Sequence, residues 1–115
     1  MDNKYFLKKN TDFVHVYRKR KTFGNRNFTL YVRKNTYDYS RMGFSISKKV
    51  GKAVIRNLIK RRLRALYKEY SSDIIAGYDM VLVVKPNVAD LSYEKLESAF
   101  SHILKVSKMK KKKKE

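Results

Sequence analysis

Cationic side chains able to bind phosphate are concentrated in one segment of the chain, KKVGKAVIRNLIKRRLRALYKEY, residues 48–70. Eight of its first seventeen residues are Lys or Arg, and no acidic residue lies between Asp38 and Glu69. Like charges at helical spacing repel one another, which costs stability. The segment therefore predicts a partner outside the chain that supplies negative charge, and phosphate is a group that arginine binds bidentately.

The spacing of apolar residues after Gly51 predicts a helix over residues 52–70. A merely solvated helix face normally carries charges of both signs, whereas the arc opposite the apolar face has no acid, so the pattern favours contact with phosphates. Arg62 projects from the apolar side and is expected to snorkel or to find a partner. The apolar face would comprise Ile55, Leu58, Ile59, Leu63, Leu66 and Tyr67, and the arc Arg56, Asn57, Lys60, Arg61, Arg64 and Lys68.

A second candidate site is an open sheet face. Residues 28–34 and 41–48 alternate in polarity, which predicts two half-buried strands that pair as a hairpin. A first helix over residues 11–20 would bring Phe13 and Tyr17 to one side of this face. Aromatic rings beside small polar groups suit unpaired bases, but the same rings could be ordinary core, and spacing alone leaves both possibilities open. The face would carry Thr29, Tyr31, Ser45 and Ser47.

Groups for protein-borne catalysis are scarce. The chain has no Cys and two histidines; His15 lies between two valines and His102 falls on the outward side of a predicted last helix. No Ser/His/Asp arrangement, metal-ligand spacing or phosphate loop can be assembled from so few groups. We expect both histidines to be surface residues and the protein to have no active site of its own.

The composition indicates a strongly basic protein. The 115 residues include 29 Lys and Arg against 10 Asp and Glu, a net charge of +19, and residues 1–107 alone carry +14. Such a field attracts polyanions, nucleic acid first and anionic membrane second. The longest apolar run, residues 80–84, is too short to span a bilayer, and the N-terminal stretch lacks the pattern of a signal peptide. We expect a cytoplasmic protein.

The remaining elements suggest a small mixed fold. Residues 22–27 suggest a turn, residues 79–85 a central strand covered on both faces, and residues 91–107 a last helix. The predicted order is α-β-β-α-β-α, with the helices packed on one sheet. Residues 1–107 would form a single domain, and residues 108–115 a disordered, lysine-rich tail.

The run GFSISKKVGKAVIRNLIKRRLR, residues 43–64, resembles the signature of the protein subunit of bacterial ribonuclease P. That family carries a small residue followed by Ser-x-Ser-Lys-Lys-x-Gly, and then Ala-Val-x-Arg-Asn-Arg-x-Lys-Arg-x-x-Arg. The stretches LKKNTDFVHVY, GNRNFTLYV and DMVLVVKPNVADLSYEKLESAF are similar to the family's first helix, first strand, and last strand with its helix. Leu58 departs from the pattern, because the family usually has Arg or Lys there, and Ala65 stands where an acid is common.

The resemblance implies an α+β fold, an α/β sandwich of about four strands and three helices. A left-handed β-α-β crossover would surround the basic helix, as in the second domain of a small-subunit ribosomal protein. The implied function is 5′ maturation of tRNA, in which the RNA subunit hydrolyses a phosphodiester with bound Mg²⁺. The protein would bind that RNA and the unpaired 5′ leader of precursor tRNA, and the Mg²⁺ would belong to the RNA and the substrate rather than to a protein site.

The same resemblance assigns residues to two binding roles. Contacts with the RNA subunit would be made by Lys48, Lys52, Arg56, Asn57, Lys60, Arg61, Arg64 and Lys68. The cleft for the leader would be lined by Phe13, Tyr17, Thr29, Tyr31, Ser45 and Lys49.

Two other classes of protein would share the positive charge. A ribosomal or general RNA-binding protein without an enzyme role would need no leader cleft, and a DNA-binding architectural protein would prefer duplex DNA. A membrane-surface role is disfavoured because the basic helix needs its apolar side for the core. We therefore expect RNA partners, and neither DNA nor a membrane.

Overall fold

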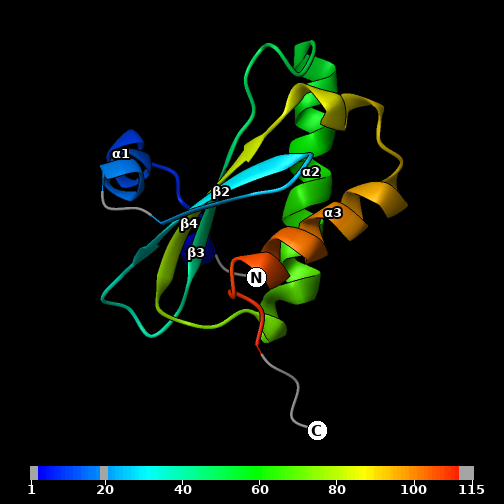
Figure 1. Ribbon diagram of the computed structural model, residues 1–115. Coiled ribbons are helices and arrows are strands. Elements are labelled where there is room, and N and C mark those ends of the chain that lie inside the picture. The colour runs from blue at the N-terminus through cyan, green and yellow to red at the C-terminus, as the bar shows by residue number, and fades with distance from the viewer. Residues whose placement is uncertain (1–2, 19–20, 112–115) are drawn as a thin grey trace, which may run out of the picture.

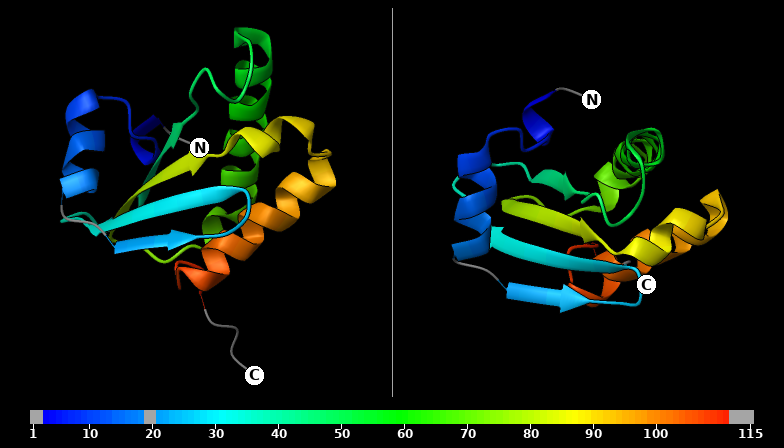
Figure 2. Two further views of the ribbon diagram at one scale, coloured as in Figure 1. Left: turned by 45° about the horizontal axis from the view of Figure 1, so that its top comes forward. Right: turned by 90° about the horizontal axis from the view of Figure 1, so that it is seen from above.

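One four-stranded sheet has helices on both faces: α2 and α3 on one side and α1 on the other (Figures 1 and 2). The computed structural model describes residues 3–18 and 21–111. The helices are α1 (Asn10–Arg18), α2 (Ala53–Tyr70) and α3 (Tyr93–Val106), and the strands are β1 (Lys21–Gly24), β2 (Phe28–Lys34), β3 (Arg41–Ser45) and β4 (Tyr78–Val84). Short 3-10 helices cover Asn3–Tyr5, Ser71–Asp73 and Pro86–Asp90. The predicted α+β class is confirmed, and the observed order α-β-β-β-α-β-α adds one strand.

The strand order is β1-β2-β4-β3, so β4 lies between the two strands predicted to form a hairpin. β4 pairs antiparallel with β2 and parallel with β3, and the predicted pairing of residues 28–34 with residues 41–48 is therefore wrong. β4 is the most apolar strand. An interior position suits such a strand, because neighbouring strands pair with both of its edges and its two faces are largely covered. β3, α2 and β4 form the expected β-α-β crossover, whose hand stays a prediction.

The additional strand, β1, occupies part of a predicted turn. Residues 22–27 are expected to turn, but β1 continues to Gly24 and pairs with β2 at the edge of the sheet. An edge strand needs only one partner and little apolar surface, so its polar sequence gives a weak strand signal. The turn itself is shorter: the side chain of Asn25 accepts hydrogen bonds from the N–H groups of Asn27 and Phe28 at 2.9 and 2.8 Å.

The main core lies between the sheet and the helices α2 and α3. Phe28, Leu30 and Val32, at alternate positions of β2, are buried there, which confirms the predicted face of that strand. Opposite them, the two helices bury large apolar side chains at helical spacing. These are Leu63 and Leu66 of α2 and Leu96, Phe100 and Ile103 of α3.

Residues 108–111, which the sequence assigns to a disordered tail, lie against the domain. Met109 is buried, and its carbonyl accepts a hydrogen bond from the N–H of Ile75 at 2.9 Å. The N–H of Lys111 donates to the carbonyl of Asp73 at 2.6 Å. The folded chain therefore extends beyond the predicted boundary at residue 107, at least to Lys111. The rest of the predicted tail, residues 112–115, lies outside the described residues, as do residues 19–20 of the predicted first helix.

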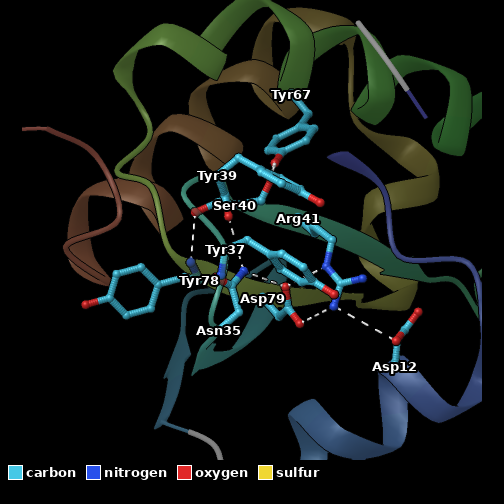
Figure 3. A network of polar contacts seen from close by, with 9 residues as sticks. All are labelled: Asp12, Asn35, Tyr37, Tyr39, Ser40, Arg41, Tyr67, Tyr78 and Asp79. Carbon is cyan, nitrogen blue, oxygen red and sulfur yellow. Dashed lines mark hydrogen bonds and ion pairs between the residues drawn. The ribbon is translucent and has the colours of Figure 1, made fainter. Parts of the chain in front are cut away.

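A polar network ties the loop before β3 to the centre of the sheet (Figure 3). Arg41 donates to both carboxylate oxygens of the buried Asp79, at 2.9 and 2.6 Å, and the amide of Asn35 donates to the same carboxylate at 2.9 Å. The guanidinium of Arg41 also lies 3.9 Å from Asp12 of α1, so the network holds α1 near the sheet. The hydrogen bond to Asp79 raises the pKa of Arg41.

Candidate nucleic-acid interface

Cations on one side of α2 and in the segment before it, together with Asn57, form a largely exposed surface, here termed the cationic arc. Its members on α2 share one side of the helix, and the other two lie in the segment that leads into it. The first turn of α2 and this segment stand beyond the edge of the sheet, at the top of Figure 1. Arg56 and Arg64 are half-buried, and the other members are exposed. The arc comprises Lys48, Lys52, Arg56, Asn57, Lys60, Arg61, Arg64 and Lys68.

Two arginines of the cationic arc also support the fold. The Nε of Arg56 donates to the carbonyl of Gly51 at 3.1 Å, which folds the side chain back onto the segment before α2. The guanidinium of Arg64 lies 4.3 Å from the ring centroid of Phe6, a buried core residue. Arg61, by contrast, is exposed. Substitutions along the arc will therefore differ in their effect on stability.

The positive charge of the arc is not balanced within the part of the chain that the structure describes. Over residues 3–18 and 21–111, both ion pairs are made by Arg41, with Asp79 and Asp12. α2 has no acidic residue in its first turn, and Lys52 at the N-cap makes no side-chain capping bond. The amide dipoles of a helix place partial positive charge at its N-terminus, so this end of α2 and the cations around it attract phosphate together.

The apolar face of α2 extends beyond the part of the helix that packs against the core. Ile55 and Leu58, predicted on the buried face, are 39% and 37% exposed, so their predicted burial is wrong. The helical spacing of apolar residues continues to the start of α2. This start of the helix extends beyond the sheet, so the apolar residues there stay exposed. Arg62, expected to find a partner, lies with its guanidinium 5.8 Å from the ring centroid of Tyr93. The buried part of the face comprises Ile59, Leu63, Leu66 and Tyr67, as predicted.

The opposite face of the sheet carries the second candidate surface, here termed the α1 platform. Thr29 of β2 and Ser45 of β3 each register with Val83 of β4, so they share a face as predicted, although β4 separates their strands. Val83 is half-buried, whereas Val81, two residues away, is fully buried. The expectation that β4 is covered on both faces therefore fails at Val83. The α1 platform comprises Phe13, Tyr17, Thr29, Tyr31, Ser45 and Val83.

Sequence reasoning missed Val83 because nothing within its strand distinguishes it from its apolar neighbours. Only its register with a threonine and a serine, on two strands distant in sequence, places it in the platform.

Phe13 and Tyr17 both pack and keep exposed surface. They are half-buried against a small cluster beneath α1, and the ring of Tyr17 meets that of Tyr31 edge-on, with 5.0 Å between centroids. The ring of Phe13 lies over Gly43, where a Cβ would overlap with it. The rings are therefore partly core, and the binding of unpaired bases by their exposed part stays a prediction. The buried cluster comprises Leu7, Val16 and Val81.

A hollow of about 330 Å³ joins the two surfaces around the β3 edge of the sheet. Phe13 of the α1 platform and Lys60 and Arg64 of the cationic arc all line it. A single-stranded polyanion could contact both surfaces through this hollow. Ser47 and Lys49 are exposed in the segment between β3 and α2, so Lys49 lies beside Lys48 of the arc rather than in the strand rows of the platform.

His15 and His102 are exposed, as expected, and Nδ1 of His102 lies 3.2 Å from the side-chain nitrogen of Asn25. Among residues 3–18 and 21–111, no group of three or more His, Cys, Asp or Glu side chains could hold a metal ion. None of the helices in the described part of the chain has the length and apolarity to cross a membrane.

Comparison with known proteins gives a consistent result. A family model described as Ribonuclease P matches residues 1–108. The ribonuclease P protein component of Alkaliphilus oremlandii is 43% identical, over 86% of this chain and 87% of that protein. The structure of the Staphylococcus aureus RNase P protein superposes with a TM-score of 0.87 at 37% identity, covering 91% of this chain and 96% of that one. A second structure of the S. aureus protein, a mutant described as having defective mRNA degradation activity, also has a TM-score of 0.87 at 37% identity, covering 91% of this chain and 89% of that one.

Proposed function

The chain belongs to the bacterial ribonuclease P protein family and is a protein component of that endoribonuclease, and we propose that its two surfaces bind two different RNAs. The cationic arc binds the catalytic RNA subunit. The α1 platform, together with Lys49, holds the 5′ leader of precursor tRNA. The RNA subunit hydrolyses the phosphodiester that joins the leader to the tRNA, which leaves the mature 5′ end.

The observation that carries the proposal is the cationic arc, whose members form no ion pair with an acidic residue in the described ranges. The phosphates of a folded RNA can neutralise these charges and release counterions, which favours association. The α1 platform supports the second half of the proposal, because aromatic rings beside threonine and serine accommodate unpaired bases. A general RNA-binding protein would share the arc but not a preference for the leader.

The family implies Mg²⁺, and the described residues do not fit a Mg²⁺ site because they hold no cluster of carboxylates. We therefore assign the metal to the RNA subunit and its substrate. The protein contributes cations that neutralise RNA phosphates, so less Mg²⁺ is needed to fold the RNA and to bind the substrate.

The first test is a reconstitution. A bacterial ribonuclease P RNA is assayed for cleavage of a 5′-extended precursor tRNA over a Mg²⁺ series, with and without the protein. We expect cleavage at the same site at lower Mg²⁺ when the protein is present. Specific cleavage of the precursor by rigorously RNA-free protein would overturn the proposed division of labour.

The RNA-free protein is also assayed on an unstructured mRNA, because the similar S. aureus structure is described in terms of mRNA degradation. Degradation of that mRNA would reveal a separate activity of the protein. The tRNA assay would still decide the proposal made here.

A Tyr31→Ala substitution tests the α1 platform. Stacking of one base on an aromatic ring is worth about 1–3 kcal/mol, so the variant holoenzyme should bind precursor tRNA about 5- to 150-fold more weakly. Its affinity for mature tRNA, which has no leader, should barely change, and Tyr31→Phe should retain most of the binding. The measurement is a titration of each holoenzyme with both tRNAs, with thermal melts as the control for folding. Equal losses for the two tRNAs would show that the ring only packs.

A further inference from the structure

The first two turns of α2 present an apolar patch to solvent, formed by Val54, Ile55 and Leu58. Their side chains are 80%, 39% and 37% exposed. Residues three and four positions apart on a helix are neighbours, and Leu58 lies four residues after Val54 and three after Ile55, so it joins the three side chains into one patch. Single exposed apolar residues are common, but an adjacent set on a projecting turn calls for an explanation.

One member of the patch, Ile55, packs against the segment that leads into α2. Methyl groups of Ile55 lie 3.2 and 3.4 Å from the place where a Cβ on Gly51 would stand, so Ile55 supports the segment before the helix. Val54 is exposed on the same turn and has no comparable role. Leu58 occupies the position where the motif of the family usually has a cation. At Leu58 the patch therefore presents methyl groups where the motif of the family usually presents charge.

The surroundings of the patch indicate the chemistry of what covers it. Lys48, Lys49 and Lys52 precede it, Arg61 follows one turn later, and all four are exposed. No acidic residue lies anywhere between Asp38 and Glu69. A purely apolar protein partner would leave this charge unmatched, whereas an unpaired base presents an apolar face beside an anionic phosphate.

We propose that the Val54–Ile55–Leu58 patch packs against an unpaired base of the RNA subunit. This inference rests on the proposed function and adds to it. The cationic arc supplies the salt-dependent part of the binding, and the patch supplies a part that does not depend on salt. At position 58, an apolar contact between Leu58 and the base therefore takes the place of the phosphate contact that a cation would make.

The test compares Val54→Ser and Leu58→Arg with a matched control, Val106→Ser. Val106 is a valine that is 40% exposed on α3, away from the arc, so the control makes the same chemical change elsewhere. Dissociation constants for a bacterial ribonuclease P RNA transcribed in vitro are measured from low to high KCl. Thermal melts verify that each variant is folded.

We expect Val54→Ser to weaken binding about tenfold at every salt concentration, since it removes about two buried carbon groups from the contact. The slope of log K against log salt should stay unchanged. Leu58→Arg should steepen that slope by about 0.7 to 0.9, the effect of one added phosphate contact. Val106→Ser should bind like the wild type.

Wild-type affinity of Val54→Ser at all salt concentrations would overturn the inference. If Arg61→Ala still weakened binding in that case, the proposed function would stand without the patch. Failure of the wild-type protein to bind the RNA would refute the proposed function, and the inference with it. Wild-type RNA affinity of Val54→Ser, combined with loss of its binding to vesicles containing phosphatidylserine, would assign the patch to a membrane instead.

Discussion

Single residues of the cationic arc differ in what they do for the fold, although all except Asn57 carry the same charge. Arg61 is exposed, whereas Arg64 lies over the ring of a buried phenylalanine that belongs to the main core. A cation over an aromatic ring at a partly exposed site is worth about 0.5–1 kcal/mol. Substitution of Arg61 should therefore test the proposed RNA binding alone, and substitution of Arg64 should test that binding and folding together.

We predict that Arg61→Ala weakens assembly with the RNA subunit and changes the free energy of unfolding by less than about 0.5 kcal/mol. Arg64→Ala should weaken assembly as well and also lower the free energy of unfolding by about 0.5–1 kcal/mol. Urea unfolding of the protein and RNA titrations check the two effects separately. Identical unfolding curves for the two variants would show that the contact with Phe6 does not stabilise the fold.

Gly43 is a residue whose small size the α1 platform requires. We predict that Gly43→Ala lowers the free energy of unfolding by about 1–3 kcal/mol, because the added Cβ would overlap with the ring of Phe13 and displace α1. Precursor tRNA binding should fall with it. Gly24→Ala is the matched control, since a Cβ there would meet only the carbonyl of Phe28, at 3.9 Å.

Combining Gly43→Ala with Phe13→Leu should restore part of the lost stability, because the smaller side chain makes room. Urea unfolding of the single and double variants gives the coupling between the two positions. Simple additivity of the two losses would contradict the proposed overlap.

At the scale of elements, residues 108–111 contribute more to the packing of the fold than their lysine-rich sequence suggests. Residues 108–111 run beside the 3-10 helix Ser71–Asp73, and an isolated β-bridge pairs Ile74 with Lys110. The buried side chain of Met109 closes one end of the main core. These contacts come from a segment whose composition indicates only solvated charge.

We predict that removing residues 108–115 lowers the free energy of unfolding by about 2–5 kcal/mol, the cost of deleting a buried methionine side chain. Removing residues 112–115 alone keeps every contact described for this segment and should change stability little. The longer truncation removes six lysines and the shorter one three, so the comparison is made at high salt, which screens the difference in charge and leaves the difference in packing. Chemical unfolding of the two truncated proteins and the full chain makes the measurement. Equal stability of the two truncations would show that Met109 does not hold the segment.

At the scale of the whole molecule, the two candidate binding surfaces lie on opposite faces of the sheet. The cationic arc lies on the side of the sheet that holds α2, and the α1 platform lies on the other side (Figure 2). The net charge of +19 is far from zero, so long-range attraction will speed encounter with any polyanion. Specificity must therefore come from the local geometry of the two faces.

We predict that assembly with the RNA subunit is strongly salt dependent. If the arc neutralises about six phosphates, log K should fall with log salt at a slope of about −4 to −5. Equilibrium binding measured from about 50 to 500 mM KCl checks this, and Arg61→Ala should make the slope shallower by about 0.7 to 0.9. A slope near zero would remove the electrostatic basis of the proposed function.

The sequence alone determined those features that depend on local pattern. Alternation correctly placed Phe28, Leu30 and Val32 on one face of β2, and helical spacing correctly gave the buried positions from Ile59 to Tyr67. The ordered motif in residues 43–64 indicated the family, which the comparisons confirm. Periodicity predicts faces because a side chain's direction follows from its position within its own element.

The tertiary structure decided which elements meet and where the core ends. It placed β4 between β2 and β3, and thereby brought Val83 into the α1 platform. It left Ile55 and Leu58 exposed on the projecting turn of α2 and buried Met109 at the chain end. The pattern within a segment predicts the direction of a side chain, but its burial depends on which distant segment lies opposite, and local spacing carries no information about that segment.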